Sequence, residues 1–212
     1  MKSISCMSHP LLVSMAAAAG IVLAGCASTS QPVLLTLPAA ETVARSAQSL
    51  PTATATPVLT LSRVELPEYL VARRVRYRAD ASTLAEWPDT FWAERIEIGV
   101  SREFAAALRQ GLSGWRLCEA NCGEQSPVAS LQVVFERMDY LRGERRLHAI
   151  VRTNFSSRDR IPEMLLSDTR SYDIPGDADS AQSQARALTE LLRRVAADAA
   201  STVGSIPRRK NS

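Results

Sequence analysis

The sequence predicts an α+β domain, with a mainly antiparallel β-sheet and two amphipathic helices packed on one face of it. Two long stretches carry apolar residues at helical spacing, and several shorter ones alternate apolar with polar residues, as half-buried strands do. Two of these strands flank a short turn, as in a hairpin. A sheet with one polar face and two helices with one apolar stripe each bury their apolar surfaces most economically when both helices cover the apolar face.

Three strands are predicted before the first helix. Residues 32–37 (PVLLTL) predict the first, and residues 58–65 predict the second, with apolar side chains at alternate positions. The intervening residues 39–57 are rich in Ser, Thr and Pro, and we expect a loop excursion without a core face. Residues 71–78 alternate again and predict the third strand.

The first helix is predicted over residues 91–112. Apolar residues recur there every three or four positions and form one stripe. They are Trp92, Ile96, Val100, Phe104, Ala107, Leu108 and Leu112. The segment 80–87 predicts a loop, residues 88–90 (PDT) are typical of a helix start, and Gly111 and Gly114 favour its end.

The C-terminal half predicts a hairpin, another strand and a second helix. Residues 128–138 and 145–156 alternate on either side of Arg142-Gly143, and residues 164–174 predict a weaker strand. The second helix is predicted over residues 180–203, which carry one apolar stripe. Asp179 with Gln182 three positions later resembles a capping box at its start.

The N-terminal stretch from Leu11 to Cys26 (LLVSMAAAAGIVLAGC) is typical of a lipoprotein signal peptide. Lys2 precedes a short apolar segment that ends in Leu-Ala-Gly-Cys, the bacterial lipobox. The apolar segment is shorter than the roughly 20 residues that a membrane-spanning helix needs. The alternative is an ordinary signal peptide that contains a cysteine. With a lipobox, Cys26 becomes the first mature residue and carries a diacylglycerol and an N-acyl chain such as palmitate.

These signals divide the chain into four parts. We expect a lipoprotein signal peptide over residues 1–25, a lipidated tether over 26–31, a single periplasmic α+β domain over 32–205 and a disordered basic tail over 206–212. The residues after Cys26 reach at most about 18 Å before the domain begins, which holds the domain close to its membrane. By the general sorting rule for lipoproteins, Ala27 rather than Asp after the cysteine points to the outer membrane.

Charge and cysteine content narrow the function further. The net charge of +3 falls to +2 when Lys2 leaves with the signal, which is too balanced to indicate a nucleic-acid partner.

Of four cysteines, Cys6 leaves with the signal and Cys26 carries lipid, so Cys118 and Cys122 remain. An oxidising periplasm favours a disulfide between these two over a metal site. Two reduced, buried thiols are the alternative.

Two short segments are candidates for a partner interface. Period two places Arg74, Arg76 and Arg78 on one strand face, which is either a solvated face that blunts a sheet edge or a contact for lipid phosphates or an acidic partner. The LPEYL segment, with Leu66, Pro67 and Tyr69, forms either a structural corner or an interface anchored by Tyr69. The partner-interface candidates are Leu66, Pro67, Tyr69, Arg74 and Arg76.

The residues do not predict catalysis, a cofactor or a metal. His148 is the only histidine after the signal, and its position in the strand pattern favours the solvent side. No G-x-S-x-G, G-x-G-x-x-G or G-x-x-x-x-G-K-[ST] motif occurs. One histidine and two closely spaced cysteines do not make a tetrahedral metal site. We therefore expect a non-enzyme whose only attached group is the lipid on Cys26.

The order of these features resembles the ABC-type transport auxiliary lipoproteins, a family that includes the paraquat-inducible protein C type. The lipobox is followed by a strand, LPEYL, a V-x-Y-R strand and W-A-E-R-I-E at the start of an amphipathic helix. The matching residues are Leu66, Pro67, Tyr69, Leu70, Val75, Tyr77, Arg78, Trp92, Ala93 and Glu94. The resemblance covers most of residues 32–203. The stretch 39–56 departs from the family pattern, because it is longer and richer in Ser, Thr and Pro.

The resemblance implies an outer-membrane lipoprotein on the periplasmic face that receives the end of an MCE (mammalian cell entry) tunnel, so that phospholipid passes between two membranes. It implies an MCE-domain protein of an ABC-type lipid transporter as partner and phospholipid as a further candidate ligand. It implies no catalysis by this chain, because the ATPase is a separate subunit. The residues also leave open a lipid-binding periplasmic carrier, an envelope-assembly lipoprotein, or an envelope hydrolase that uses His148 as its base.

Overall fold

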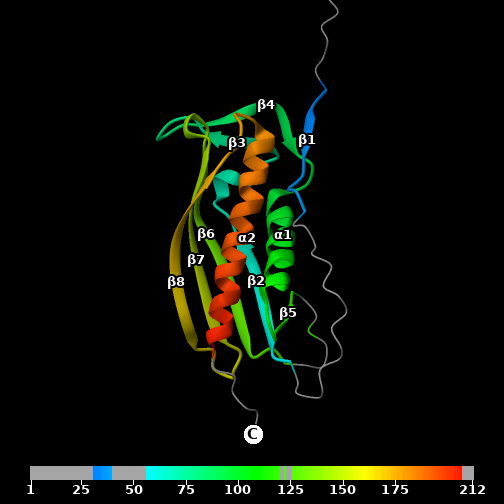
Figure 1. Ribbon diagram of the computed structural model, residues 1–212, viewed down its shortest axis with the longest axis vertical. Coiled ribbons are helices and arrows are strands. Elements are labelled where there is room, and N and C mark those ends of the chain that lie inside the picture. The colour runs from blue at the N-terminus through cyan, green and yellow to red at the C-terminus, as the bar shows by residue number, and fades with distance from the viewer. Residues whose placement is uncertain (1–30, 40–55, 120–121, 123–125, 207–212) are drawn as a thin grey trace, which may run out of the picture. The chain divides into compact units, whose positions relative to one another are not determined.

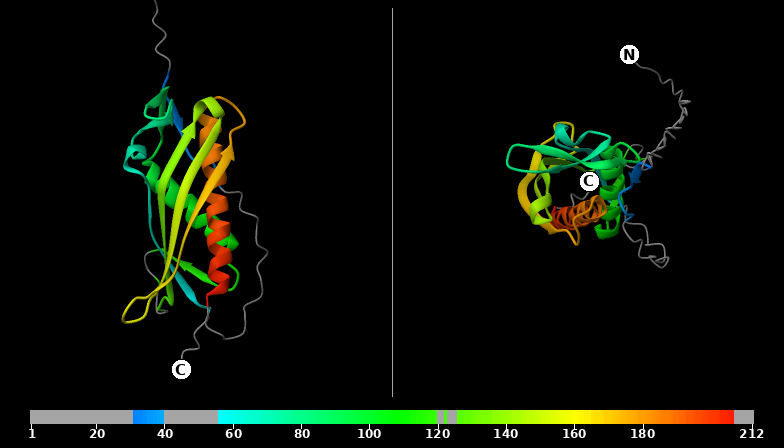
Figure 2. Two further views of the ribbon diagram at one scale, coloured as in Figure 1. Left: turned by 90° about the vertical axis from the view of Figure 1, so that its left-hand side faces the viewer. Right: turned by 90° about the horizontal axis from the view of Figure 1, so that it is seen from above.

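A computed structural model describes residues 31–39, 56–119, 122 and 126–206 of the chain (Figure 1). Over these residues the fold has two layers, a large β-sheet and the helices α1 (Ile96–Gly111) and α2 (Ala181–Ser205). Both helices cover the same face of the sheet, which bends around them (Figure 2, right). The predicted α+β class and its two-helix layer are confirmed. The predicted signal peptide and Cys26, most of the loop excursion and nearly all of the basic tail lie outside the described residues.

The longest strand pairings are antiparallel. Strand β6 (Ala129–Leu141) pairs with β7 (Arg146–Ser157), and β7 pairs with β8 (Met164–Pro175), each along nearly its full length. A third antiparallel pair joins β3 (Arg74–Arg78) to β4 (Leu84–Trp92). The predicted hairpin and the strand that follows it are therefore confirmed, with boundaries within three residues of those expected.

The other pairings are parallel, so the eight-stranded sheet of the described residues is mixed. Strand β1 (Val33–Leu35) runs parallel to β4, and β5 (Arg116–Cys118) runs parallel to β2 (Val58–Glu65). Strands β2 and β3 both run parallel to β6. Parallel neighbours require long crossover connections, so short-range alternation in the sequence does not reveal them.

Strands β2 and β3 follow one edge of β6 in succession. β2 pairs with β6 from Leu59 to Glu65, and β3 joins the same edge only at the far end, where Arg78 pairs with Leu141. Between them the chain leaves the edge in a short 3₁₀ turn, η1 (Glu68–Leu70), directly after Pro67. Proline lacks an amide hydrogen and favours such a break in a strand.

The hydrophobic core lies between the helices and the sheet. Its large fully buried side chains include Phe104, Phe135, Tyr140, Phe155 and Leu191, which come from α1, the β6–β7 hairpin and α2. Burial of a side chain of this size contributes roughly 1.5–3 kcal/mol. The two helices also pack on each other, and the absence of a side chain at Gly111 permits this, because a Cβ there would lie 3.0 Å from the Cβ of Ala200.

The predicted start of the first helix is wrong. Residues 84–92 form strand β4 rather than a loop and a helix start, and α1 begins only at Ile96. The Trp92 amide donates a 2.7 Å hydrogen bond to Arg73 O, and the Ala93 amide donates a 2.7 Å bond to Leu35 O. Pairing with strands on both sides therefore overrides the helical spacing of Trp92, Ile96 and Val100.

The predicted capping box of the second helix is also corrected. Ser180 is the N-cap of α2, and its hydroxyl accepts a 3.1 Å hydrogen bond from the Ser183 amide. Serine in this position satisfies one of the free amides of the first turn. Asp179 instead receives two hydrogen bonds from Arg142 in η2 (Arg142–Glu144), the turn between β6 and β7.

Strand β8 forms one edge of the sheet and, within the described residues, pairs only with β7. Its Arg170 ion-pairs with Asp168 on the same strand and with Asp198 on α2, at 2.6 and 3.1 Å. Tyr172 also donates a 2.8 Å hydrogen bond to Asp198. Burial, followed by this hydrogen bond, raises the pKa of Tyr172. The helix-facing side of this edge therefore carries charged groups that are bonded to α2.

Candidate functional site

The LPEYL segment forms a corner that is partly buried against the core. Leu66 and Leu70 pack against the core cluster, and Pro67 O accepts a 3.0 Å hydrogen bond from the Leu70 amide. The Tyr69 hydroxyl accepts a hydrogen bond from the Met138 amide, at 3.3 Å. These contacts account for the segment as a structural corner. An interface role for Leu66, Pro67 and Tyr69 stays a prediction.

A buried carboxylate, Asp139 on β6, ties this corner to β3. It is 2% exposed and accepts hydrogen bonds from Arg78 at 2.9 Å and from Arg137 at 2.7 Å. Burial alone would raise the pKa of Asp139, but the hydrogen bonds from Arg137, Arg78 and the Tyr69 hydroxyl outweigh it and hold the pKa below its usual value. Arg78, the most buried of the three predicted arginines, therefore makes a structural contact within the fold.

The other two arginines lie nearer the surface and share one carboxylate. Glu86 on β4 lies 3.4 Å from Arg74 and 3.3 Å from Arg76. The Arg74 guanidinium also lies over the Phe91 ring, 4.8 Å from its centroid, and Arg76 donates a 3.0 Å hydrogen bond to Tyr69 O. Arg74 and Arg76 therefore share one partner, whereas Arg78 has another, and an interface role for Arg74 and Arg76 stays a prediction.

The arginines border a surface hollow of about 500 Å³, which we call the β3 depression. It lies where β1 and β4 meet the start of β3, at the end of the fold where the described chain begins (Figure 1). Its lining residues are Pro32, Leu34, Ala72, Arg73, Arg74, Arg76, Glu86 and Phe91. The hollow combines apolar walls with guanidinium groups, a composition that suits an anion with an apolar neighbour.

The β3–β4 hairpin is fastened to α2 by a buried amide. Trp87 Nε1 donates a 2.7 Å hydrogen bond to Gln184 Oε1, and Gln184 Nε2 donates a 2.7 Å bond to Arg76 O. Arg142 lies over the Trp87 ring at 4.3 Å and donates a 2.8 Å hydrogen bond to the Tyr77 hydroxyl. These contacts fix the position of the hairpin that carries the β3 depression.

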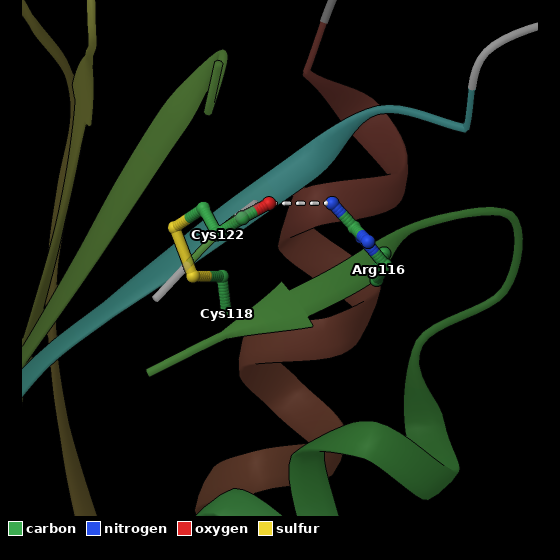
Figure 3. Close-up of a disulfide and its surroundings, with 3 residues drawn as sticks. All are labelled: Arg116, Cys118 and Cys122. Carbon is green, nitrogen blue, oxygen red and sulfur yellow. Dashed lines mark hydrogen bonds between the residues drawn. A yellow bond between two sulfur atoms is a disulfide. The ribbon is translucent and has the colours of Figure 1, made fainter. Parts of the chain in front are cut away.

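Cys118 and Cys122 form the predicted disulfide (Figure 3). Cys118 ends β5, and Arg116 on the same strand donates a 2.9 Å hydrogen bond to Cys122 O across the small loop (Figure 3). The bond and the arginine together hold Cys122 beside β5 at the edge of the sheet. The disulfide is therefore a local clamp rather than part of the β3 depression.

The described residues contain no cluster that indicates a metal site. No group of three or more His, Cys, Asp or Glu side chains in the described part of the chain could hold a metal ion. His148 is partly exposed, and its Nδ1 lies 3.0 Å from Asp173 Oδ1, which is also bonded to Arg146. No helix among these residues is both long and apolar enough to span a membrane.

Comparison with models of known protein families identifies the family of this chain. The model of the ABC-type transport auxiliary lipoprotein component family matches residues 36–200. The chain belongs to this family. The predicted resemblance is confirmed at this level, and the chain is a lipoprotein component that accompanies an ABC-type transport system. No curated protein matches the chain.

Two solved structures share the fold of this lipoprotein. A crystal structure of an uncharacterized protein has a TM-score of 0.65 at 13% identity, over 82% of this chain and 99% of that one. A crystal structure of a Xanthomonas campestris protein of the DUF330 family has a TM-score of 0.57 at 13% identity, over 82% of this chain and 94% of that one. At this identity the likeness shows the fold alone.

Sequence reasoning missed the partners of the arginines. Glu86 lies on β4, the next strand in the chain, whereas Asp139 on β6 and Gln184 on α2 are far from β3 in the chain. The sequence held one signal. Apolar and polar residues alternate along most of β6, and Asp139 directly after Met138 is part of it. An acidic residue within a buried strand usually has a charged partner.

Proposed function

We propose that this chain is the outer-membrane-anchored lipoprotein of an ABC/MCE-type intermembrane lipid transport system, where it docks the periplasmic MCE tunnel to the membrane without catalysing a reaction. The family match over residues 36–200 carries this proposal, because it begins ten residues after the lipobox cysteine Cys26. The short tether keeps the domain near the bilayer, as docking requires.

The two ends of the domain suit a bridging role. β1 enters at one end, beside the β3–β4 hairpin, whereas the β7–β8 connection and the C-terminal end of α2 lie at the other (Figures 1 and 2). The 25 residues of α2 span about 37 Å between these ends. Anchorage through Cys26 therefore leaves the β7–β8 end free to face a periplasmic partner.

That far end exposes apolar side chains. Ile161 is 77% exposed and Met164 is 62% exposed, and Leu165 and Leu166 beside them are also exposed. Several exposed apolar side chains within one short segment at the end of a domain favour a protein–protein contact. We assign the MCE-domain protein to this patch.

The packed core disfavours a lipid carrier. In the described residues, the space between helices and sheet is filled by buried side chains such as Phe104, Phe135 and Leu191. A carrier needs a groove there large enough for an acyl chain. Native mass spectrometry that detects phospholipid bound to the mature protein would favour the carrier instead.

A first experiment tests the anchor. Cys26→Ala should release the protein from the outer-membrane fraction and reduce recovery of the MCE complex with that fraction, because the acyl chains are lost. Cys6→Ala is the matched control, since this cysteine leaves with the predicted signal peptide. If the Cys26→Ala protein stays in the outer membrane and the complex is unaffected, the anchoring role is wrong.

A second experiment tests the docking patch with the anchor intact. Ile161→Asp combined with Leu165→Asp should reduce co-purification of the MCE protein about tenfold or more, since each buried apolar anchor contributes upwards of 1 kcal/mol. Ile98→Asp, at an apolar residue on α1 that is 54% exposed, is the matched control. Equal recovery from the patch variant and the control variant would contradict docking at this end.

A further inference from the structure

The β3 depression carries more positive than negative charge. Arg73, Arg74 and Arg76 line it together with a single carboxylate, Glu86. Arg73 is exposed, and no ion pair within the described residues includes it. The bridges from Glu86 are 3.3 Å or longer and partly exposed, and such pairs hold their arginines only weakly.

Neighbouring carboxylates do not cancel this charge, because they have arginines of their own. A smaller hollow adjoins the β3 depression through Ala72 and Arg73 and includes Glu94 and Glu97. Glu94 receives hydrogen bonds from Arg102 at 2.7 and 2.8 Å, and Glu97 is bonded to Arg95. The guanidinium of Arg73 therefore remains available to an outside anion.

Apolar side chains lie directly beside these arginines. Leu34 is 58% exposed and lines the depression with Pro32, and Val33 next to them is 41% exposed. Exposed apolar residues flanked by arginines are typical of surfaces that lie in the headgroup region of a membrane. A bilayer offers phosphate to the guanidinium groups and an apolar interface to these side chains at the same place.

The position of the depression in the chain identifies the membrane as its occupant. Pro32, which lines it, comes six residues after Cys26. Six extended residues span at most about 21 Å, so an acylated Cys26 holds the depression within that distance of the bilayer. We propose that the β3 depression binds the phosphate groups of anionic membrane phospholipids, with Arg73 and Arg74 as the main contacts. This inference rests on the proposed anchorage at Cys26.

Phospholipid contact would set the orientation of the domain. Guanidinium groups pair bidentately with phosphate, and Leu34 beside them can enter the interface between headgroups and acyl chains. With the arginine end held on the bilayer, the apolar β7–β8 end would point away from it. The contact would thus direct the docking patch towards the periplasm, which the tether alone would not do.

The experiment uses the mature acylated protein in vesicles of phosphatidylcholine alone or mixed with phosphatidylglycerol. Flotation of the vesicles reports the anchor, and phenylglyoxal modification followed by mass spectrometry reports the accessibility of each arginine. We expect Arg73 and Arg74 to be modified about fivefold more slowly in the anionic vesicles, with recovery in high salt. Arg160, exposed at the opposite end, is the control and should react equally in both.

The outcomes separate this inference from the anchor. Flotation in both vesicle types with equal modification of Arg73 would overturn the inference and leave the anchor intact, and so would equal protection of Arg73 and Arg160. Flotation only with anionic vesicles, lost in Arg73→Glu, would support the inference without the anchor. Absence of flotation in either vesicle, with Arg73 unprotected, would overturn both.

Discussion

Gly176 lies between β8 and α2, and we expect Gly176→Ala to destabilise the fold. A Cβ at this position would lie 2.6 Å from the Tyr140 hydroxyl and 2.8 Å from Ser183 Oγ. It would also lie 3.1 Å from Arg145 O, which accepts a 2.6 Å hydrogen bond from the Gly176 amide. Because the site is closed on three sides, a methyl group can enter only if neighbouring atoms move.

The expected cost follows from what must move. The Tyr140 hydroxyl donates a 3.3 Å hydrogen bond to Ala178 O, and Ser183 Oγ accepts a 3.1 Å bond from the Ala178 amide. The Tyr140 ring is buried and cannot withdraw. Overpacking of this kind costs about 1–3 kcal/mol, and a displaced hydrogen bond costs about 1 kcal/mol more. We therefore expect Gly176→Ala to lower the free energy of unfolding by about 2–4 kcal/mol.

Urea unfolding of the mature protein, with its disulfide intact, measures this change through the midpoint at constant slope. Gly204→Ala is the matched control, because nothing lies within 4 Å of a Cβ there and the residue is in the last turn of α2. It should raise the unfolding free energy by up to about 1 kcal/mol, since alanine favours the helix over glycine. Equal midpoints for Gly176→Ala and the wild type would refute the packing argument.

Three other perturbations test the rest of the fold. Asp139→Asn should cost about 3–5 kcal/mol at neutral pH. Because the folded pKa of Asp139 is lowered, its contribution to the free energy of unfolding is present above the unfolded pKa of about 3.9. That contribution is lost as the pH falls through the folded pKa, so the urea midpoint of the variant should change less on acidification than that of the wild type. Serine at both Cys118 and Cys122 should cost about 2 kcal/mol in thermal unfolding, from a loop of five residues, and no change would exclude the clamp. Gln184→Leu should cost about 1–3 kcal/mol, because Trp87 Nε1 loses its partner, and an unaltered melting temperature would contradict this.

The elements that the sequence predicted well are those whose pattern is local. The hairpin of β6 and β7 alternates over both arms around Arg142-Gly143, and α2 carries one unbroken apolar stripe between Ser180 and its end. In both cases the residues that decide the structure are near neighbours in the chain. The disulfide was predictable for the same reason, because Cys118 and Cys122 are four residues apart.

The features that the sequence did not reveal depend on contacts between distant segments. Trp92 fits the spacing of α1, yet its amide is bonded to Arg73 O, directly before β3, so it ends a strand. The parallel pairing of β1 with β4 has no local signature, since residues 33–35 meet residues 90–92 only in the folded chain. The arginine face was foreseen from period two, but the different partners of Arg74 and Arg78 could not be.

The outer edge of β8 has a consequence for a protein held at a surface. Lipoproteins diffuse in two dimensions, where neighbouring copies collide often and in similar orientations. Copies that expose a long unpaired strand edge can pair edge to edge into a continuous sheet. Charged side chains that face inward along the edge strand are one means of preventing this pairing. Arg170, held between Asp168 and Asp198, supplies that charge. A crowded layer of this protein can therefore remain a population of separate molecules, each free to engage its own partner.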